Sequence, residues 1–217
     1  MATSTEENYL KAILHLEDTK GAATVGDIAS ELELTSGTVT TMMQHLSEKG
    51  LIDYVPRRGL KLRRHGRLAA LKVVRRHRLI ELFLVEIMKF DWSEVHDEAE
   101  DLEHVVSDLL LDRMDEMLGR PTHDPHGDPI PDRNGKLTLV DSSSLAEVEE
   151  GDYRVVRVSD ENSALLEWLN QKGLKIGGEF TVSRKDRAAG ILEIQRGGEA
   201  ALQLGLEMAG RMYVEEV

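Results

Sequence analysis

The 217-residue sequence contains no cysteine. Disulfide frameworks and metal sites built on thiolates are therefore excluded. The chain also lacks an apolar run near the roughly 20 residues that a membrane span needs, and its polar, acidic first residues lack the apolar core of a secretory signal. The sequence thus predicts a cytoplasmic protein without a membrane partner, long enough for two or three small domains.

Basic residues are the minority, with 27 Lys and Arg against 40 Asp and Glu, for a net charge of -13. This balance argues against nucleic-acid binding until the charge is divided along the chain. Residues 1–75 hold eleven basic and nine acidic residues, a net charge of +2. Between Tyr54 and Ile80 there are ten basic residues and no acidic one. The N-terminal part of this acidic protein is therefore compatible with binding the phosphates of a nucleic acid.

Three helices are predicted near the N-terminus. Residues 6–18 carry the apolar stripe of an amphipathic helix, and Thr24 is a predicted N-cap with Asp27 as its partner in an approximate capping box. A third helix follows a short turn and extends to Gly50. Two helices joined by a tight turn, the second with small polar residues at its early exposed positions, indicate a helix-turn-helix. The residues expected to face DNA are Thr35, Ser36, Gly37, Thr38, Thr40, Thr41 and Gln44.

A basic hairpin is predicted next, with strands at 51–55 and 60–64 around a turn that contains Arg57 and Arg58. After a helix-turn-helix, such a hairpin is the wing of a winged-helix domain and contacts the phosphate backbone. The alternative is a basic loop on a solvated surface. The short side chains of the DNA-facing helix favour thymine-methyl and phosphate contacts, so specificity is expected to depend partly on DNA shape.

Candidate metal ligands are concentrated in residues 72–104, which read as two helices joined by a turn at 90–93. His77 and Glu81, four residues apart, share one face of the first helix, and Ser93 is a predicted N-cap of the second. One stripe of the second helix carries four further candidates, His96, Glu100, Glu103 and His104. Imidazoles and carboxylates gathered in this way indicate a divalent metal. Such spacing is also common on solvated helices, so it leaves both interpretations open.

The apolar pattern predicts that the second helix continues to Gly119. Its apolar stripe is wider than one small core needs, so a helix from a second subunit is one hypothesis and packing within the chain is the other. The following loop, residues 120–135, holds four of the five prolines. Asp124 and His126 in this loop are candidate oxygen and nitrogen ligands, unless the segment is only a linker.

From residue 145 onward, five short strands with Gly-rich turns and one inserted helix predict a small β-barrel of SH3 type. No catalytic constellation is evident there, and Asp160 is expected to cap the inserted helix. The predicted fold class is mainly α with small β parts. It comprises a winged helix-turn-helix at 1–72, a helical metal-binding and dimerisation domain at 73–141, and an SH3-like domain at 142–217.

Four segments, in this order, resemble the diphtheria toxin repressor family of metal-dependent transcription regulators. They are EENYLKAI, RRHRLIELFL, VHDEAEDLEHVVSD and DPHGDPIP. The resemblance implies a homodimeric repressor that binds Mn(II) or Fe(II), recognises a palindromic DNA operator and represses metal-uptake genes.

The resemblance also implies the ligand sets. One site falls on Asn8, Glu100, Glu103 and His104. The second site falls on His77, Glu81 and His96 in iron-type members. In manganese-type members with the SH3-like tail, it resembles a set formed by Glu81, Asp124, His126 and a carboxylate near Asp160.

Two positions depart from the family pattern. Glu100 stands where iron-type members carry cysteine, and a carboxylate there favours Mn(II). Asn8 stands where the family has Met or Asp, and its neutral amide removes a charge that helps to hold a cation. Lys11, at a position that is sometimes a carboxylate in relatives, cannot supply an anion. The resemblance therefore implies the manganese-responsive branch, with Fe(II) as the alternative.

Two other classes of protein remain open at this point. A metalloenzyme is one, because Glu/His clusters on helices also serve hydrolases and di-metal oxidases. It would leave the basic wing unexplained, and no nucleophile is evident. A winged-helix regulator that responds to a small organic effector is the other. We expect neither catalysis nor an organic ligand.

Overall fold

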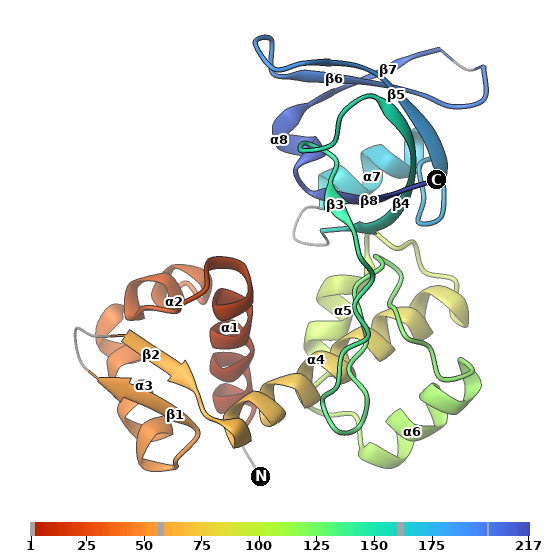
Figure 1. Cartoon of the computed structure of the whole chain (residues 1–217). Coiled ribbons are helices and arrows are strands. Elements are labelled where there is room, and N and C mark those ends of the chain that lie inside the picture. The colour runs from red at the N-terminus through yellow and green to blue at the C-terminus, as the bar shows by residue number, and fades with distance from the viewer. Residues whose placement is uncertain (1–2, 56–58, 160–162, 199) are drawn as a thin grey trace. The chain divides into compact units, whose positions relative to one another are not determined.

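A computed structural model of the chain describes residues 3–55, 59–159, 163–198 and 200–217 (Figure 1). The chain forms two compact units. Unit 1 consists of Met1–His77, Leu102–Ser107 and Pro131–Leu137. Unit 2 consists of Arg78–Asp101, Asp108–Ile130 and Thr138–Val217.

Unit 1 contains the predicted helix-turn-helix and the predicted hairpin, and both are confirmed. Its elements are α1 (Ser4–Lys20), α2 (Val25–Glu31), α3 (Ser36–Glu48), β1 (Ile52–Val55), β2 (Gly59–Leu62) and the first part of α4 (Arg64–Glu86). The strands β1 and β2 pair antiparallel. Thr24 caps α2 by accepting from the Asp27 amide at 3.1 Å. Thr35 caps α3 in the same way, accepting from the Thr38 amide at 3.2 Å.

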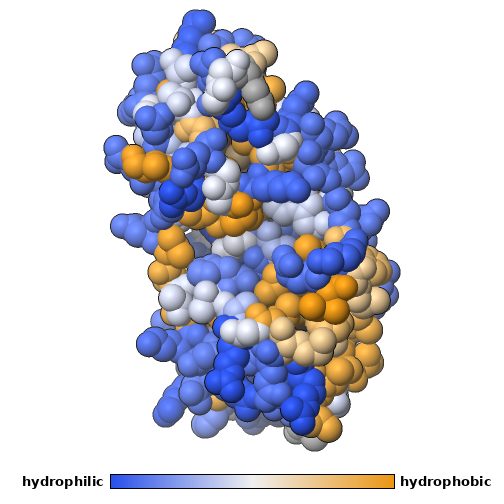
Figure 2. All heavy atoms as spheres, turned by 90° about the vertical axis from the view of Figure 1, so that its right-hand side faces the viewer, coloured by the Kyte–Doolittle hydropathy of each residue, from blue (hydrophilic) through white to orange (hydrophobic). Residues whose placement is uncertain are grey.

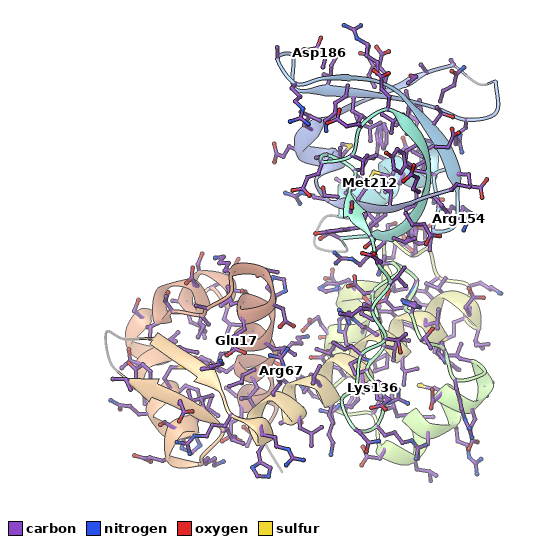
Figure 3. The ribbon with its side chains drawn as sticks, in the orientation of Figure 1. Glu17, Arg67, Lys136, Arg154, Asp186 and Met212 are labelled. Carbon is purple, nitrogen blue, oxygen red and sulfur yellow. The ribbon has the colours of Figure 1, made fainter. Side chains whose placement is uncertain are left out.

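The core of unit 1 forms where α1 packs against the helix-turn-helix and the hairpin. Every residue of the apolar stripe predicted for α1 is buried, namely Tyr9, Leu10, Ile13, Leu14 and Leu16. Glu17 at the end of α1 accepts from the Leu62 amide at 2.7 Å and pairs with Arg67 at 3.2 Å. Figure 3 shows Glu17 and Arg67 pointing toward each other. The end of α1 is therefore tied both to the hairpin and to α4.

A buried carboxylate joins α1 to α3. Glu6 is 2% exposed, and its carboxylate bonds His45 Nε2 at 2.7 Å, the Thr3 amide at 2.9 Å and the Lys49 ammonium. Burial raises the pKa of Glu6, but hydrogen bonds from Lys49, Thr3 and His45 outweigh that effect and lower the pKa from 4.5 to about 2.

Removing this carboxylate is expected to change how stability depends on pH. The folded-state pKa lies below the unfolded value, so the stabilisation is present above pH 4.5 and is lost as the pH falls toward 2. Its full size is about 3 kcal/mol. We expect Glu6→Gln to lower the free energy of unfolding above pH 4.5. We also expect the free energy of unfolding to fall less steeply between pH 4.5 and 2, as measured by urea unfolding. The control is Glu48→Gln, which alters an exposed carboxylate on α3. If the stability of Glu6→Gln fell as steeply as that of the wild type in acid, Glu6 would not be the source of the pH dependence.

The helical part of unit 2 differs from the sequence prediction at one point. The prediction of an unbroken helix to Gly119 was wrong, because α5 (Val95–Leu102) ends in a turn and α6 (Asp108–Met117) begins afresh. Two β-branched residues, Val105 and Val106, disfavour helix at the break. The predicted N-cap is also misplaced: α5 starts two residues after Ser93, whose hydroxyl donates to Asp91 Oδ1 at 2.6 Å instead.

The remainder of unit 2 is an antiparallel sheet, as the SH3-like prediction requires. Its strand order is β3-β8-β4-β5-β6-β7. The strands are β3 (Ser143–Ser144), β4 (Gly151–Val158), β5 (Glu179–Asp186), β6 (Ile191–Gln195), β7 (Leu202–Gly205) and β8 (Met212–Glu216). The predicted helix is α7 (Ser163–Gln171), and a short α8 (Leu206–Ala209) was not anticipated. Met212 lies in the core of this sheet (Figure 3).

Among the residues that the structure describes, no helix combines the length and the apolar character needed to cross a bilayer.

Candidate functional site

The predicted DNA-facing residues lie at the start and along one side of α3. Val39, Met43 and Leu46 are buried on the opposite side. All but one of the predicted contacts are exposed and Thr40 is half-buried, the set being Thr35, Ser36, Gly37, Thr38, Thr40, Thr41 and Gln44. Arg57 and Arg58 lie outside the residues that the structure describes. The exposed side of α3 is therefore small and polar, and it is available to a partner.

Unit 2 brings Glu81 of α4 together with Asp124 and His126 of the Pro-rich loop. All three residues are buried, and one ligand atom from each lies within 4.8 Å of the others. The loop is held by backbone hydrogen bonds, including His126 O accepting from Val158 N of β4 at 2.9 Å. It is therefore docked on the sheet, and its two candidate ligands are placed inside the unit.

The imidazole of His126 is oriented by a backbone carbonyl. Its Nε2 lies 2.8 Å from the carbonyl oxygen of Trp92, which can only accept. Nε2 therefore carries a proton, and in the neutral ring Nδ1 keeps its lone pair. Nδ1 is buried, has no hydrogen-bond partner and lies 3.9 Å from Glu81 Oε2. A neutral imidazole with a lone pair directed at a carboxylate is the form that binds a metal.

Asp124 divides its two carboxylate oxygens between two roles. Oδ1 accepts from the amides of His126 and Asp128, both at 2.9 Å, and thereby fixes the turn. Oδ2 is buried without a hydrogen-bond partner, 3.4 Å from Arg78 Nε. Burial and the nearby carboxylates of Asp128 and Glu81 raise the pKa of Asp124 well above 3.8. Buried carboxylates held this close are typical of a site that takes a cation.

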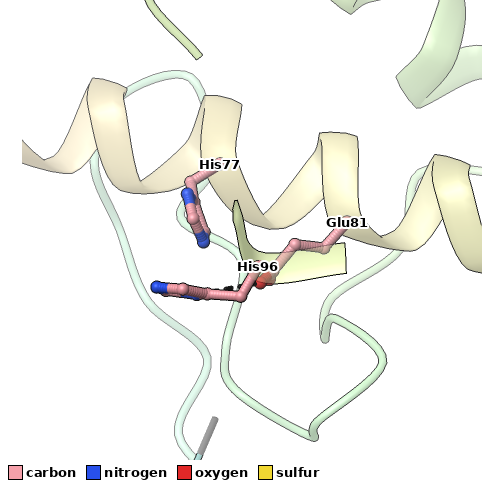
Figure 4. Close-up of side chains that lie close together, drawn as sticks. All are labelled: His77, Glu81 and His96. Atoms are coloured by element: carbon pink, nitrogen blue, oxygen red, sulfur yellow. Dashed lines mark ion pairs between the residues drawn. The ribbon is translucent and has the colours of Figure 1, made fainter. Parts of the chain in front are cut away.

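His96 and Glu100 lie on α5 beside this cluster. His96 Nδ1 is 3.5 Å from Glu81 Oε1, and its Nε2 is 3.9 Å from Glu100 Oε1. Figure 4 shows His96 next to Glu81, with His77 one turn earlier on α4. Both α5 residues remain partly exposed, unlike Glu81, Asp124 and His126.

Unit 1 holds a second cluster, at the turn that follows α5. Glu103 is fully buried there and contacts Lys11 Nζ and His77 Nδ1, each at 2.8 Å. The turn places His104 Nε2 at 3.3 Å from Glu103 Oε1. His104 Nε2 and Asn8 Oδ1 are both buried without a hydrogen-bond partner. Glu103 and His104 thus offer an oxygen and a nitrogen donor that suit a cation. Asn8 Oδ1 is a further buried oxygen of unit 1 that has no hydrogen-bond partner.

In unit 1, the carboxylate of Glu103 is paired with the ammonium group of Lys11. Burial raises the pKa of Glu103, but the hydrogen bond from His77 and the charge of Lys11 lower it below 4.5 overall. Sequence reasoning noted only that Lys11 is not an anion, and it missed this pairing. It also missed Glu7, whose Oε2 lies 2.8 Å from His104 Nδ1 and 2.7 Å from Arg76.

The predicted site residues thus fall in several places. His77, Asn8, Glu103 and His104 belong to unit 1, whereas Glu81, His96, Glu100, Asp124 and His126 belong to unit 2. Asp160 lies outside the described residues. Glu103 and His104 were expected to continue the stripe of a helix, but they are carried by the turn after it.

Large hydrophobic side chains are exposed on α6. Leu109 is 70% exposed and Met117 is 63% exposed, with Leu110 between them at 48%. Hydrophobic residues also gather along one side of the face drawn in Figure 2. Isolated exposed apolar residues are ordinary, but several on one short helix indicate a contact surface.

Three family models match the chain in sequence. They are the iron dependent repressor N-terminal DNA binding domain over residues 1–60, the iron dependent repressor metal binding and dimerisation domain over residues 63–132, and the FeoA domain over residues 143–216. The order of these domains agrees with the predicted order.

Individual proteins are similar as well. The chain is 33% identical over 156 residues to the iron-dependent repressor IdeR of Mycobacterium leprae, a match that covers 72% of this chain but 65% of that protein. It is 38% identical over 225 residues to the diphtheria toxin repressor of Corynebacterium glutamicum, covering 98% of this chain and 96% of that one.

A solved structure described as a manganese-dependent transcriptional repressor complex with manganese superposes with a TM-score of 0.91 at 34% identity. That match covers 97% of this chain and 99% of the other. The fold, the domain order and the 38% identity over nearly the full length agree: the chain belongs to the diphtheria toxin repressor family of metal-dependent, DNA-binding repressors.

Proposed function

We propose that this protein is a cytoplasmic, homodimeric, Mn(II)-dependent repressor that binds palindromic duplex DNA and controls metal-uptake genes. The observation that carries the proposal is the buried set of Glu81, Asp124 and His126. Two of its atoms, Asp124 Oδ2 and His126 Nδ1, are buried without hydrogen-bond partners. Such atoms are costly in a folded protein unless a ligand satisfies them.

The donor set favours a hard divalent ion. The oxygens come from carboxylates and an amide, the nitrogens come from imidazoles, and the chain has no cysteine. Carboxylate oxygen suits Mn(II), whereas thiolates select softer ions. Fe(II) is the alternative, because the similar protein of Mycobacterium leprae is described as an iron-dependent repressor. Both ions accept oxygen and nitrogen donors, so direct competition is needed to separate them.

We assign two groups of residues to cation binding. The unit 2 group is Glu81, Asp124 and His126, with His96 and Asp160 as further candidates. The unit 1 group is Asn8, Glu103 and His104, with His77 as a further candidate. Glu100, which the resemblance adds to this ligand set, belongs to unit 2. A bound divalent cation would supply the positive charge that offsets the repulsion and burial of these carboxylates.

The residues of unit 1 provide a route from the second group to the DNA-facing helix. Asn8 lies on α1, two residues after Glu6. Glu6 holds His45 of α3 and Lys49, the residue that caps the C-terminus of α3. A change in how α1 is held at Glu103 and His104 is therefore transmitted to α3 through the buried Glu6 carboxylate and its two exposed partners. Coupling of this kind between two sites is typically 1–3 kcal/mol, or about 5- to 150-fold in affinity.

The exposed side chains of α6 support the proposed homodimer. A second copy covering Leu109, Leu110 and Met117 would remove apolar surface from water, and a two-fold dimer suits an operator with two half-sites. Of the three predicted domains, 1–72 would then bind DNA, 73–141 would bind metal and dimerise, and 142–217 would support the loop that carries Asp124 and His126.

DNA binding is expected to require Mn(II). Duplexes would be selected from a random pool by the metal-loaded protein, and their affinity measured by fluorescence anisotropy with Mn(II), with Mg(II) and with a chelator. We expect binding about 5- to 150-fold tighter with Mn(II) than with chelator, and little gain from Mg(II), which retains its water ligands. Anaerobic titration with Fe(II) distinguishes the alternative ion. Equal affinity in Mn(II) and in chelator would contradict the proposal.

A further inference from the structure

The side chain of Glu7 makes two contacts that none of the ligand assignments above uses. One carboxylate oxygen, Oε2, lies 2.8 Å from His104 Nδ1 and 2.7 Å from the guanidinium of Arg76. Glu7 is on α1, Arg76 on α4 and His104 on the turn after α5, so three separate segments of unit 1 meet at this oxygen.

The contact determines which nitrogen of His104 carries the proton. A carboxylate paired with a guanidinium only accepts hydrogen bonds, so Nδ1 must be the donor. In the neutral ring, Nε2 then keeps its lone pair. That nitrogen is buried without a hydrogen-bond partner and lies 3.3 Å from Glu103 Oε1. The protonated edge of the ring thus faces α1, and the lone pair faces the carboxylate.

We infer that Glu7 is a positioning residue for cation binding at His104. This inference rests on the proposed function, because it assumes a cation at the group formed by Asn8, Glu103 and His104. A carboxylate behind a ligating imidazole fixes the ring and its tautomer, and it raises the basicity of the ligand nitrogen. Arg76 holds Glu7 in place through its guanidinium.

The residue that follows Glu7 on α1 is the neutral Asn8. Asn8 brings no charge to the cation, but Glu7 places a carboxylate from the same helix behind the imidazole. The helix that contacts α3 through Glu6 is therefore coupled to His104 by a hydrogen bond, in addition to any bond from Asn8.

The experiment combines two variants with one matched control. Glu7→Met removes the acceptor, whereas Glu7→Gln retains an acceptor oxygen and removes the charge. The control, Asp18→Asn, also removes one α1 carboxylate and its ion pair with an arginine, here Arg67 at 2.9 Å, but leaves His104 untouched. Ring ¹⁵N shifts of His104 in metal-free protein report the tautomer, and paramagnetic broadening of the same signals during Mn(II) titration reports binding at this group.

We expect wild-type protein and Asp18→Asn to show His104 protonated at Nδ1 and to bind Mn(II) alike. Glu7→Met is expected to lose that tautomer and to bind about 10- to 100-fold more weakly at His104, with Glu7→Gln in between. An unchanged tautomer and affinity in Glu7→Met, or an equal loss in Asp18→Asn, would overturn the inference. Sharp His104 signals in wild-type protein at saturating Mn(II) would instead contradict the proposed cation site itself.

Discussion

Asp124→Asn is expected to weaken Mn(II) binding in unit 2 strongly while making the metal-free protein more stable. The asparagine oxygen can still accept from the amides of His126 and Asp128, so the turn is preserved. What disappears is a buried negative charge near Glu81 and Asp128, whose repulsion together with burial raises the pKa of Asp124. Loss of an outer-shell partner alone costs 10- to 100-fold in metal affinity, so loss of a direct ligand is expected to cost at least about 100-fold.

The measurement is thermal unfolding with and without Mn(II), together with calorimetric titration. A ligand that binds only the folded state raises its stability, so wild-type protein should gain stability on adding Mn(II) and the variant should gain less. Asp132→Asn is the matched control, because Asp132 Oδ1 accepts from the amides of Asn134 and Lys136 in the same pattern, at an exposed position. Wild-type Mn(II) affinity in Asp124→Asn would remove Asp124 from the ligand set.

Gly127→Ala is expected to disrupt the loop that carries Asp124 and His126. Gly127 has φ of +87°, and a Cβ there would lie 2.0 Å from the carbonyl oxygen of Val156 and 2.9 Å from Arg157 Cα. The left-handed backbone costs alanine roughly 1–2 kcal/mol, and forcing the loop away from β4 adds about 1–3 kcal/mol. We expect a loss of about 3 kcal/mol in stability, together with weaker Mn(II) binding because Asp124 and His126 move.

Gly177→Ala separates the two contributions. Gly177 has a similar φ of +81°, but its Cβ would meet nothing within 4 Å. Its loss of stability, measured by urea unfolding, should therefore be limited to the backbone cost of roughly 1–2 kcal/mol, with Mn(II) binding unchanged. Equal effects of the two alanines on stability and on Mn(II) affinity would show that the close approach of Gly127 to β4 is unimportant.

The parts of the fold that follow from local patterns could be predicted from the sequence. The apolar stripe of α1, the caps at Thr24 and Thr35 and the alternating strands of the sheet depend on neighbours a few residues away. The break between α5 and α6 could not be found in this way, because apolar residues continue at helical spacing across it. The β-branched pair Val105 and Val106 was the available signal.

The candidate site shows the same division. His126 and Asp124 could be proposed as ligands because their residue types suit a metal, but their burial depends on the loop docking on β4, to which it is not adjacent in sequence. Glu7 and Lys11 were missed because their partners, His104 and Glu103, are more than ninety residues away in the chain. A carboxylate or an ammonium on a helix carries no local mark of a tertiary partner.

Buried carboxylates and imidazoles in each unit are proposed to hold a divalent cation. The most direct test is an anomalous difference map from crystals grown with Mn(II). We predict one peak within coordination distance of Glu81, Asp124 Oδ2 and His126 Nδ1. We predict a second peak within coordination distance of Glu103, His104 Nε2 and Asn8 Oδ1. A map with no peak at either group of side chains, in protein saturated with Mn(II), would contradict the account.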